Sequence, residues 1–455
     1  MSNPIRAAQL SDSTAAQSEV RSSKRSSADV AETAYRDARY RYFVLGLLTL
    51  VYVLSFVDRQ IVNILGEYII TDLQLSDAQF GALSGIAFAA IYVIAGIPVA
   101  RLADVGVRRN VIAIALAVWS IMTALCGAAQ NFWQLFLARA GVGIGESGGS
   151  PPSHSIISDI FPANQRSTAL SIYSLGVYGG VLVGYVIGGY LAAAFSWRVA
   201  FVVVGLPGVL LALVLRATVK EPPRGMSESR KDHGVPPMKN VLGLLWNRRS
   251  FRHLSFACAL HAFVTYGLGN FLPVFMGRVH QMPIEHIGIW LGLAGGFGGL
   301  AGTFAGGVLS DKLANRSGDL RWHLWVPLYS TLIAIPFYLL TFLLMESGTG
   351  AALSWFVPAF VGGMYLGPCL SMTHGLVGLR MRAVASAILF FVINLIGLGL
   401  GPLLTGLLSD MLRPHYGEEA IRFALASMVI VNVWCAVHYH LASKTLRHDL
   451  ARAPA

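Results

Sequence analysis

The feature that most constrains this chain is a series of apolar segments, each long enough to cross a lipid bilayer. Phe43–Val57 and Val199–Leu215 are two examples, in which apolar residues follow one another without the alternation that a membrane β-strand requires. A transmembrane helix needs about 20 predominantly apolar residues. Of the 455 residues, 55% are hydrophobic and only 13% are charged, whereas a soluble domain is about a quarter charged. The expected fold class is therefore an all-α membrane protein.

A window of span length predicts twelve transmembrane helices, six on either side of a polar segment. The first six are expected at 42–65, 79–102, 110–129, 132–160, 168–195 and 197–219, and the last six at 253–279, 284–313, 323–345, 351–376, 384–412 and 421–442. The expected domains are a disordered cytoplasmic tail (1–41), a six-helix bundle (42–219), a cytoplasmic linker (220–252), a second six-helix bundle (253–442) and a cytoplasmic tail (443–455).

Basic residues alternate from loop to loop, and this pattern predicts the orientation. One loop carries Arg101, Arg108 and Arg109, whereas the preceding loop, Glu67–Asp77, has no Lys or Arg. Since Lys and Arg concentrate in cytoplasmic loops, both termini and the linker are expected in the cytoplasm. The protein is then a multi-pass protein of the cytoplasmic (inner or plasma) membrane. The net charge of +11 is explained by this topology, and no nucleic-acid partner is needed to account for it.

The cysteines give no sign of a metal site or a disulfide framework. Cys126, Cys258, Cys369 and Cys435 all lie inside apolar runs and lack metal-site spacing. We expect buried free thiols that pack as small hydrophobic side chains. The chain also lacks a nucleotide-binding glycine loop and a convincing catalytic constellation. We expect no cofactor, no metal and no enzymatic activity.

A short motif occurs at corresponding places in the two halves. Ala100–Arg109 and Gly307–Arg316 each combine a helix end, an Asp and following basic residues. Two six-helix halves repeated in parallel are the architecture of a large transporter class. The motif resembles a loop of the major facilitator superfamily, in which it helps to latch a cytoplasmic gate. The resemblance implies a gate built from Asp104, Arg101, Arg108, Asp159, Asp311 and Arg316.

Two specific gate contacts are expected. Asp104 would lie at a helix N-terminus of the other half, where the helix dipole favours an anion. Arg101 or Arg108 would pair with Asp159 at the cytoplasmic end of the fourth span. The alternative is that these charges only set the topology.

A few ionisable residues remain inside the spans, where each is costly and a functional candidate by default. At 1.5 Å per residue, Asp58 and Arg139 fall in the outer half of the bilayer and Glu146 near its middle. Arg139 and Glu146 are seven residues apart and share a helix face. Arg139 would pair with one carboxylate while the other takes a proton. The alternatives are a static buried ion pair and neutralisation of Asp58 by Arg59.

The fourth span, from Arg139 through Gly143-Ile144-Gly145-Glu146, resembles the superfamily's proton-coupling motif. Together with Phe56-Val57-Asp58-Arg59 it is similar to the Spinster branch. The resemblance implies that Asp58, Arg139 and Glu146 are the coupling residues. Eukaryotic members of that branch are similar to exporters of sphingosine-1-phosphate or lysophospholipids. The following Ser150-Pro151-Pro152 predicts a bent or broken helix beside the site.

The second half contributes mainly apolar and aromatic residues to the expected cavity. An apolar wall opposite a charged one would suit an amphipathic substrate, although aromatic residues in spans also serve simple packing. The candidate cavity residues are Phe56, His154, Phe263, Tyr266, Asn270, Tyr365, Met372, Phe390 and Asn394. His261 and His374 are expected to be satisfied by neighbouring helices. Rows of glycine at 176–188 and 292–299 predict close helix packing, either static or sliding.

The predicted function is proton-coupled secondary transport of an amphipathic lipid, such as a lysophospholipid or a sphingoid phosphate, by alternating access. One alternative is transport of small organic anions or drugs, and another is an uncoupled lipid scramblase or a membrane enzyme. The expected partners are the lipid or small anionic substrate, protons and the surrounding membrane lipids. The protein is expected to be a monomer.

Overall fold

The computed structural model describes residues 30, 32–227, 238–378 and 381–454, and this described part is helical with no β-strand. The first half comprises α2 (Ala38–Ile64), α3 (Gly66–Asp72), α4 (Asp77–Ser84), α5 (Ile86–Val105), α6 (Arg108–Cys126), α7 (Phe132–Glu146), α8 (Ser150–Ile160), α9 (Ala163–Ala194) and α10 (Trp197–Thr218).

The second half is built in the same way, with three π-helical turns inside its long helices. Its elements are α11 (Met238–Trp246), α12 (Arg249–Arg278), α13 (Ile284–Leu293), η1 (Ala294–Gly298), α14 (Gly299–Ser317), α15 (Trp322–Leu339), η2 (Leu340–Leu344), α16 (Gly348–Ser354), α17 (Phe356–Gly362), α18 (Leu366–Gly375), α19 (Arg382–Val392), η4 (Ile393–Leu400), α20 (Gly401–Tyr416), η5 (Gly417–Glu419), α21 (Ala420–Met428) and α22 (Val431–Ala451).

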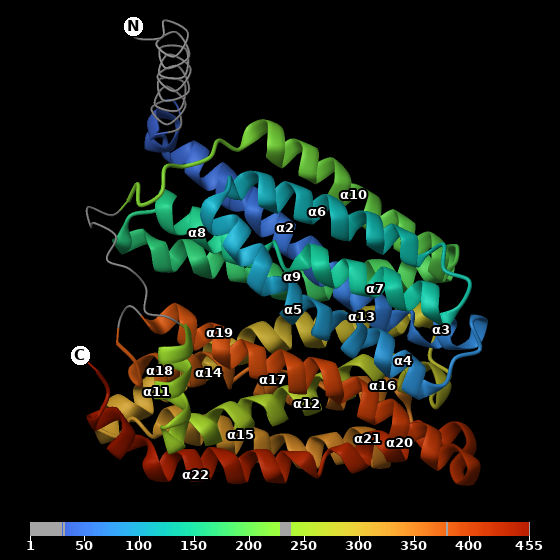
Figure 1. The fold of residues 1–455 in the computed structure, drawn as a ribbon. Helices are drawn as coiled ribbons and strands as arrows, with labels where there is room; N and C mark the ends of the chain where they lie inside the picture. Colours follow the sequence, from blue (N-terminus) through green and yellow to red (C-terminus); the bar gives the residue numbers. More distant parts are fainter. Residues whose placement is uncertain (1–29, 31, 228–237, 379–380, 455) are drawn as a thin grey trace, which may run out of the picture.

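Ten described segments are long and apolar enough to cross a membrane. One of them, Arg382–Ala451, contains an outgoing span (α19 to α20) and a returning span (α21 to α22), as Figure 1 shows. The fourth predicted span does not count among the ten because it is divided into α7 and α8. Taken together, these segments agree with the predicted twelve-helix fold.

The ends of several elements differ from the predicted ranges. Residues 1–29 and 31 of the predicted tail, and residues 228–237 of the predicted linker, lie outside the described residues. The described end of that tail is helical at 32–36, and α2 already begins at Ala38. The buried Tyr35 donates to the Lys220 carbonyl at 2.5 Å. At the other end, α22 continues to Ala451, nine residues beyond the predicted 442.

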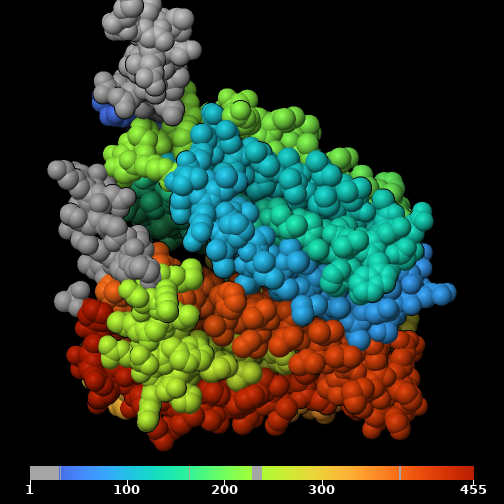
Figure 2. All heavy atoms as spheres, in the orientation of Figure 1, coloured from blue at the N-terminus to red at the C-terminus, as the bar shows by residue number. Residues whose placement is uncertain are grey.

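The two halves meet at one end of the molecule and separate toward the other. Figure 1 shows the first half above the second, with both chain ends on the separated side. At the contact side, a Cβ on Gly85 would lie 2.8 Å from the Gly399 carbonyl oxygen, and one on Gly189 would lie 2.8 Å from the Ile284 oxygen. Figure 2 shows the surface hollowed between the halves on the separated side.

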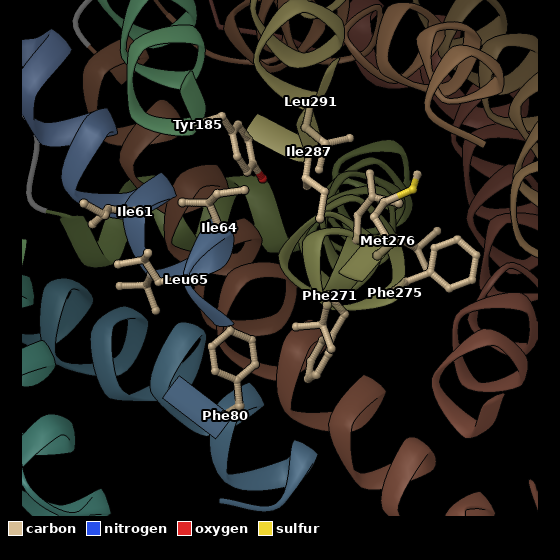
Figure 3. Close-up of a cluster of buried hydrophobic side chains, with 14 of the residues drawn as sticks. Ile61, Ile64, Leu65, Phe80, Tyr185, Phe271, Phe275, Met276, Ile287 and Leu291 are labelled. Atoms are coloured by element: carbon tan, nitrogen blue, oxygen red, sulfur yellow. The ribbon is translucent and has the colours of Figure 1, made fainter. Parts of the chain in front are cut away.

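The largest hydrophobic cluster lies at the contact side and is shared by both halves (Figure 3). Its labelled members from the first half are Ile61, Ile64, Leu65, Phe80 and Tyr185, and those from the second are Phe271, Phe275, Met276, Ile287 and Leu291. Of two further clusters, one consists of first-half residues joined by Leu398 of the second half, and the other lies within the second half. The shared apolar core therefore holds the halves together at one end only.

The two glycine rows serve different contacts. The row at 176–188 packs α9 against α2 of the same half, as at Gly180, where a Cβ would meet Val53 and Phe56. The row at 292–299 instead lies across the boundary between halves, and Gly296 approaches Leu182 and Tyr178 of α9. Only the second row is placed where the halves would move against each other.

Candidate functional site

The glycines of α7 allow two neighbouring helices to approach its end. A Cβ on Gly143 would lie 2.8 Å from the Phe88 carbonyl oxygen of α5, and one on Gly145 would lie 2.6 Å from the Trp119 nitrogen of α6. The helix stops at Glu146, and α8 begins at Ser150 with prolines in its first turn. The predicted break beside the site is therefore confirmed. Glu146 therefore lies at the end of α7, beside α5 and α6.

Glu146 forms a buried ion pair with Arg59 of α2. Its Oε2 atom accepts hydrogen bonds from Arg59 Nε at 2.7 Å and from Ser55 Oγ at 2.8 Å. Arg59 Nη2 also lies 2.7 Å from the same oxygen. The Glu146 side chain is fully inaccessible and that of Arg59 is 17% accessible. Charge-assisted hydrogen bonds of this kind are about twice as strong as neutral ones.

This geometry corrects two expected pairings. The cation of Glu146 is Arg59, and Arg59 does not neutralise Asp58. Arg139 reaches only the main-chain oxygen of Asp58, at 3.4 Å from its Nη1 atom. The reason is the arrangement of α2, on which Asp58 and Arg59 are adjacent and point to different neighbours. Asp58 turns toward Thr123 and Trp119 of α6, which are polar neighbours of its carboxylate.

Several buried polar atoms at this junction lack a hydrogen-bond partner among the described protein atoms. They are Asp58 Oδ1, Trp119 Nε1, Thr123 Oγ1, Arg139 Nε and Glu146 Oε1. Each such buried group costs about 1–3 kcal/mol. A concentration of buried polar groups between α2, α6 and α7 marks this junction as a candidate functional site.

Aromatic rings surround the two arginines. The Arg59 guanidinium lies 4.9 Å from the Phe56 ring centroid, 4.7 Å from that of Phe88 and 5.3 Å from that of Tyr92. Arg139 lies over the same Phe88 ring at 5.4 Å. These cation–π contacts stabilise charge in a place that water reaches poorly. Phe88 and Tyr92 were absent from the predicted site, because an aromatic residue in a span gives no sign of the arginine it will face.

A small cavity of about 10 Å³ adjoins Glu146, with Ser55, Ser150, Tyr52 and Tyr173 among its lining residues. This volume is about that of one water molecule. The broken helix opens the cavity, because Ser150 follows the turn between α7 and α8. A single polar molecule could therefore reach the carboxylate from the side of the turn.

The structure places the predicted cavity residues in different surroundings. Phe56 packs on Arg59, and Tyr266 of the second half lies within electrostatic reach of Arg59 and Tyr92. Phe263 and Met372 lie in hydrophobic clusters instead, and the buried Asn270 donates to the Ser84 carbonyl at 3.4 Å. Of the others, Tyr365 stacks on His261 at 4.0 Å, His154 packs edge-on to Tyr173 at 5.1 Å, Asn394 is half-buried and Phe390 is exposed.

Both candidate histidines of the second half make ordinary hydrogen bonds. His261 contacts Thr331 Oγ1 at 3.2 Å and the Gly362 carbonyl at 3.0 Å, and His374 contacts Ser386 Oγ at 2.6 Å. Neighbouring helices thus satisfy them, as expected. The four cysteines are buried and free. No group of metal-binding side chains occurs in the searched, described part of the chain.

The predicted gate residues do not join the two halves in this conformation. Arg108 forms the expected ion pair with Asp159. It also forms an ion pair with Glu221 at 2.8 Å and donates a hydrogen bond to the Pro222 carbonyl at 2.8 Å. Its role is therefore to hold the start of the linker against α6 and α8. In the second copy of the motif, Asp311 bonds to His323 of the same half at 3.0 Å.

The remaining gate residues are free in this conformation. Arg101, Asp104 and Arg316 are exposed, and none of them forms an ion pair with another described residue. Asp104 therefore does not occupy a helix N-terminus of the other half. The reason is that the halves are separated at this end of the molecule (Figure 1).

Sequence reasoning missed a polar network at the opposite end, where the halves meet. Arg278, the last residue of α12, binds Glu67 at 2.8 Å and Asp77 at 3.0 Å, both from the first half. Asp410 of α20 caps the N-terminus of α4, accepting from the main-chain nitrogens of Asp77 at 3.0 Å and Ala78 at 2.8 Å. We call these residues the outer latch, because the orientation proposed below places them at the outer face. A signal was present, since Arg278 ends a predicted span on the same side as the acidic loop Glu67–Asp77.

Comparisons with known proteins agree with this architecture. The family model described as Major Facilitator Superfamily matches residues 48–402. An MFS-type efflux pump of Mycolicibacterium smegmatis (strain ATCC 700084 / mc(2)155) is 34% identical over 419 residues, which cover 90% of this chain and 95% of the relative. Protein spinster homolog 1 of Homo sapiens is 27% identical over 416 residues, covering 84% of this chain and 76% of the relative.

A solved structure is similar over almost the whole chain. It is the crystal structure of a bacterial homologue of the human lysosomal transporter Spinster, in an inward-facing and occupied conformation. The identity is 34%, the TM-score is 0.80, and the match covers 91% of this chain and 99% of that chain.

The chain belongs to the major facilitator superfamily, and it is a multi-pass membrane transporter rather than an enzyme. Within that superfamily it resembles the Spinster branch, as the residues around Asp58 and Glu146 predicted.

Proposed function

We propose that this protein is a proton-coupled secondary transporter whose coupling site consists of Asp58, Arg59, Arg139 and Glu146. The observation that carries the proposal is the buried Glu146–Arg59 ion pair beside an Asp58 carboxylate that lacks a cationic hydrogen-bond partner. Burial without a partner favours the neutral form of a carboxyl group. Because Arg59 and Glu146 already neutralise each other, a proton on Asp58 would leave Arg139 as the one uncompensated charge of the site.

The proposed cycle uses exchange of partners at the two arginines. An anionic group of the substrate competes with Glu146 for Arg59, which cannot lose its own charge. Loss of the proton from Asp58 then attracts Arg139, which already contacts the Asp58 main chain at 3.4 Å. These exchanges alter the contacts between α2 and α7. They bias the rocking of the bundles at 42–219 and 253–442, in keeping with alternating access.

The proposed substrate is an amphipathic lipid with an anionic head, such as a lysophospholipid or a sphingoid phosphate. Support comes from the contrast between a cationic region and an apolar region of the site. Arg59 within its aromatic rings would meet the head, and Tyr266 lies opposite it. The side chains of Phe390 and Phe391 on α19 are 37% and 45% exposed, and α19 borders the space between the halves (Figure 1). These apolar residues would accept the tail.

Transport of a small organic anion or drug is the second candidate. It is favoured by the similarity to the mycobacterial efflux pump, and the rings around Arg59 would also accept a compact aromatic anion. An uncoupled scramblase would gain nothing from an ion pair buried at the cost of desolvating both charges.

The proposed orientation places both chain ends and the linker in the cytoplasm, in a cytoplasmic membrane. Arginines are abundant at the end where the halves separate, among them Arg101, Arg108 and Arg109. In that orientation the described conformation is open to the inside, and the outer latch closes the opposite face. The exposed Asp104 and Arg316 would form gate contacts when the inner side closes. We propose that the transporter works as a monomer.

The experiment is flux into liposomes that contain the purified full chain, with and without a pH gradient. Lysophospholipids, sphingoid phosphates and small organic anions are compared in parallel. We expect Glu146→Gln to abolish the stimulation by the gradient, while Glu346→Gln, a control at an exposed carboxylate, keeps it. Stimulation of Glu146→Gln to the wild-type level would refute the coupling site. Gradient-driven flux of small anions with none of the lipids would favour the second candidate.

A further inference from the structure

A second polar site lies away from the coupling site, in the seam between α12 and α22. It is a cavity of about 390 Å³ lined by Arg249, Arg252, His253, Phe256 and His438. The residues belong to the first turns of α12 and to the facing part of α22, at the end that carries both chain termini (Figure 1). No residue of the coupling site takes part.

The basic groups of this cavity are not neutralised from within. Neither Arg249 nor Arg252 forms an ion pair with any described residue. Asp449, the acidic residue at the end of α22, accepts hydrogen bonds from the main-chain nitrogen and the Oγ atom of Ser250 at 2.9 and 2.7 Å. The cavity therefore presents two uncompensated guanidinium groups. Guanidinium is the side-chain group best suited to bidentate recognition of a phosphate.

The two histidines add a hydrogen-bond donor to the cavity. Their Nδ1 atoms face each other at 3.1 Å, so one ring donates and the other accepts. A neutral ring that accepts at Nδ1 carries its hydrogen on Nε2, and neither Nε2 atom has a hydrogen-bond partner among the described residues. At least one ring N–H is thus left to bind a further acceptor next to the arginines.

Aromatic side chains border the basic cavity. Phe256 and Trp434 pack on the His438 ring at 5.8 and 6.0 Å, and Trp246 of α11 packs edge-on to Phe256 at 6.5 Å. These aromatic residues are 39%, 59% and 46% exposed, in that order. Figure 2 shows α11 on the surface beside α22. Exposed aromatic residues next to basic ones are typical of a membrane interface.

We propose that this cavity binds the phosphate headgroup of an anionic phospholipid from the leaflet that contacts the end with both termini. Arg249 and Arg252 bind the phosphate, the His253–His438 pair donates to it, and Phe256 and Trp434 contact the start of the acyl chains. Basic pockets between transmembrane helices bind anionic headgroups in this manner. The site is independent of the transported substrate, and it would fasten the seam of α12 and α22 to the surrounding lipid.

The test measures binding of a fluorescent phosphatidylglycerol to the full chain in phosphatidylcholine nanodiscs. Since each basic residue near the surface contributes about 1 kcal/mol, the double variant Arg249→Ala/Arg252→Ala should bind about thirtyfold more weakly. The control Lys220→Ala/Lys444→Ala removes the same charge from exposed positions and should bind as the wild type does. An equal loss in both variants, or no loss in the first, would overturn the proposal.

Two further arms use the unaltered protein and so do not depend on how a variant folds. A photoreactive phosphatidylglycerol should label peptides containing residues 246–256 and 434–438, and labelling confined to other peptides would contradict the site. Unlabelled phosphatidylglycerol should displace the fluorescent lipid, whereas inorganic phosphate at the same concentration should not. Equal displacement by inorganic phosphate would show a soluble anion site instead of a lipid site.

Discussion

Glu146 Oε2 lies 2.7 Å from Arg59 Nε, so the buried carboxylate at the end of α7 is neutralised by α2 and not by the arginine on its own helix. Arg139 shares a face of α7 with Glu146, yet it extends toward the main chain of Asp58. The site therefore contains one completed ion pair and one incomplete pair. This asymmetry is what a proton-dependent exchange of partners requires.

The roles of the two arginines can be separated by substitution. Arg59→Ala should leave Glu146 buried without a cation, and breaking a buried pair in this way costs about 3–5 kcal/mol. Arg139→Ala removes no hydrogen bond to a carboxylate of the described residues and should cost less stability. We expect the loss of thermal stability in detergent to be larger for Arg59→Ala. Equal losses, or a larger one for Arg139→Ala, would mean that Glu146 exchanges partners already in the resting protein.

The outer latch should control how often the outer face opens. Arg278→Ala removes the contacts to Glu67 and Asp77, and we expect the outward-open population to rise. Spin labels at the exposed Tyr68 and Tyr416 should then show a longer distance in a larger fraction of molecules. Arg422→Ala is the matched control, because its pair with Glu419 lies within one half and includes no partner of Arg278. An unchanged distance distribution for Arg278→Ala would remove the latch from the gating mechanism.

The close backbone approach at Gly189 should also be specific to the closed outer face. A side chain there would lie 2.8 Å from the Ile284 carbonyl oxygen of the other half, so Gly189→Val should oppose closure. We expect the same spin labels to report more outward-open protein. Gly96→Ala is the control, since a Cβ at Gly96 meets nothing within 4 Å. If Gly189→Val lowers the Tm but leaves the distance distribution unchanged, the contact is structural and has no part in gating.

One loop provides a pH prediction outside the membrane. Asp319 accepts hydrogen bonds from Arg321 at 2.9 Å and Arg447 at 2.8 Å, and the bonds from Arg321 lower the pKa of Asp319 to about 2. A lowered carboxyl pKa stabilises the fold above the ordinary value of about 3.9 and ceases to do so as the pH falls toward 2. The difference in Tm between wild type and Asp319→Asn should be constant above about pH 5 and shrink below about pH 4. A difference that varies near neutral pH would contradict this.

Much of the fold could be predicted because hydropathy encodes span positions directly. The break at Glu146 was also predictable, because Pro151 and Pro152 cannot continue the preceding helix. It was harder to predict which side chains of a span face the cavity, the core or the lipid. Phe263 and Met372 were expected in the cavity but pack in the core, since lipid, core and cavity walls are all apolar in a membrane protein.

The pairing of the charged side chains was the second feature that could not be predicted from the sequence. The sequence places Asp58 and Arg139 in the outer half of the bilayer and Glu146 near its middle, and several pairings are compatible with those depths. The choice depends on how α2 and α7 are rotated, and different contacts position the two helices. Gly143 and Gly145 of α7 pack against α5 and α6, whereas α2 packs against Gly180 and Gly184 of α9. The outer latch was missed for a related reason, because Arg278 and Asp77 are distant in sequence and meet only when the halves close.

The most direct test of the account is the number of protons that move with the substrate. A pH-sensitive dye inside liposomes should report proton movement during substrate flux through the wild type. In Asp58→Asn we expect substrate exchange to continue at equal internal and external pH, with no accompanying proton movement. Proton movement in Asp58→Asn at the wild-type ratio to substrate would contradict the account.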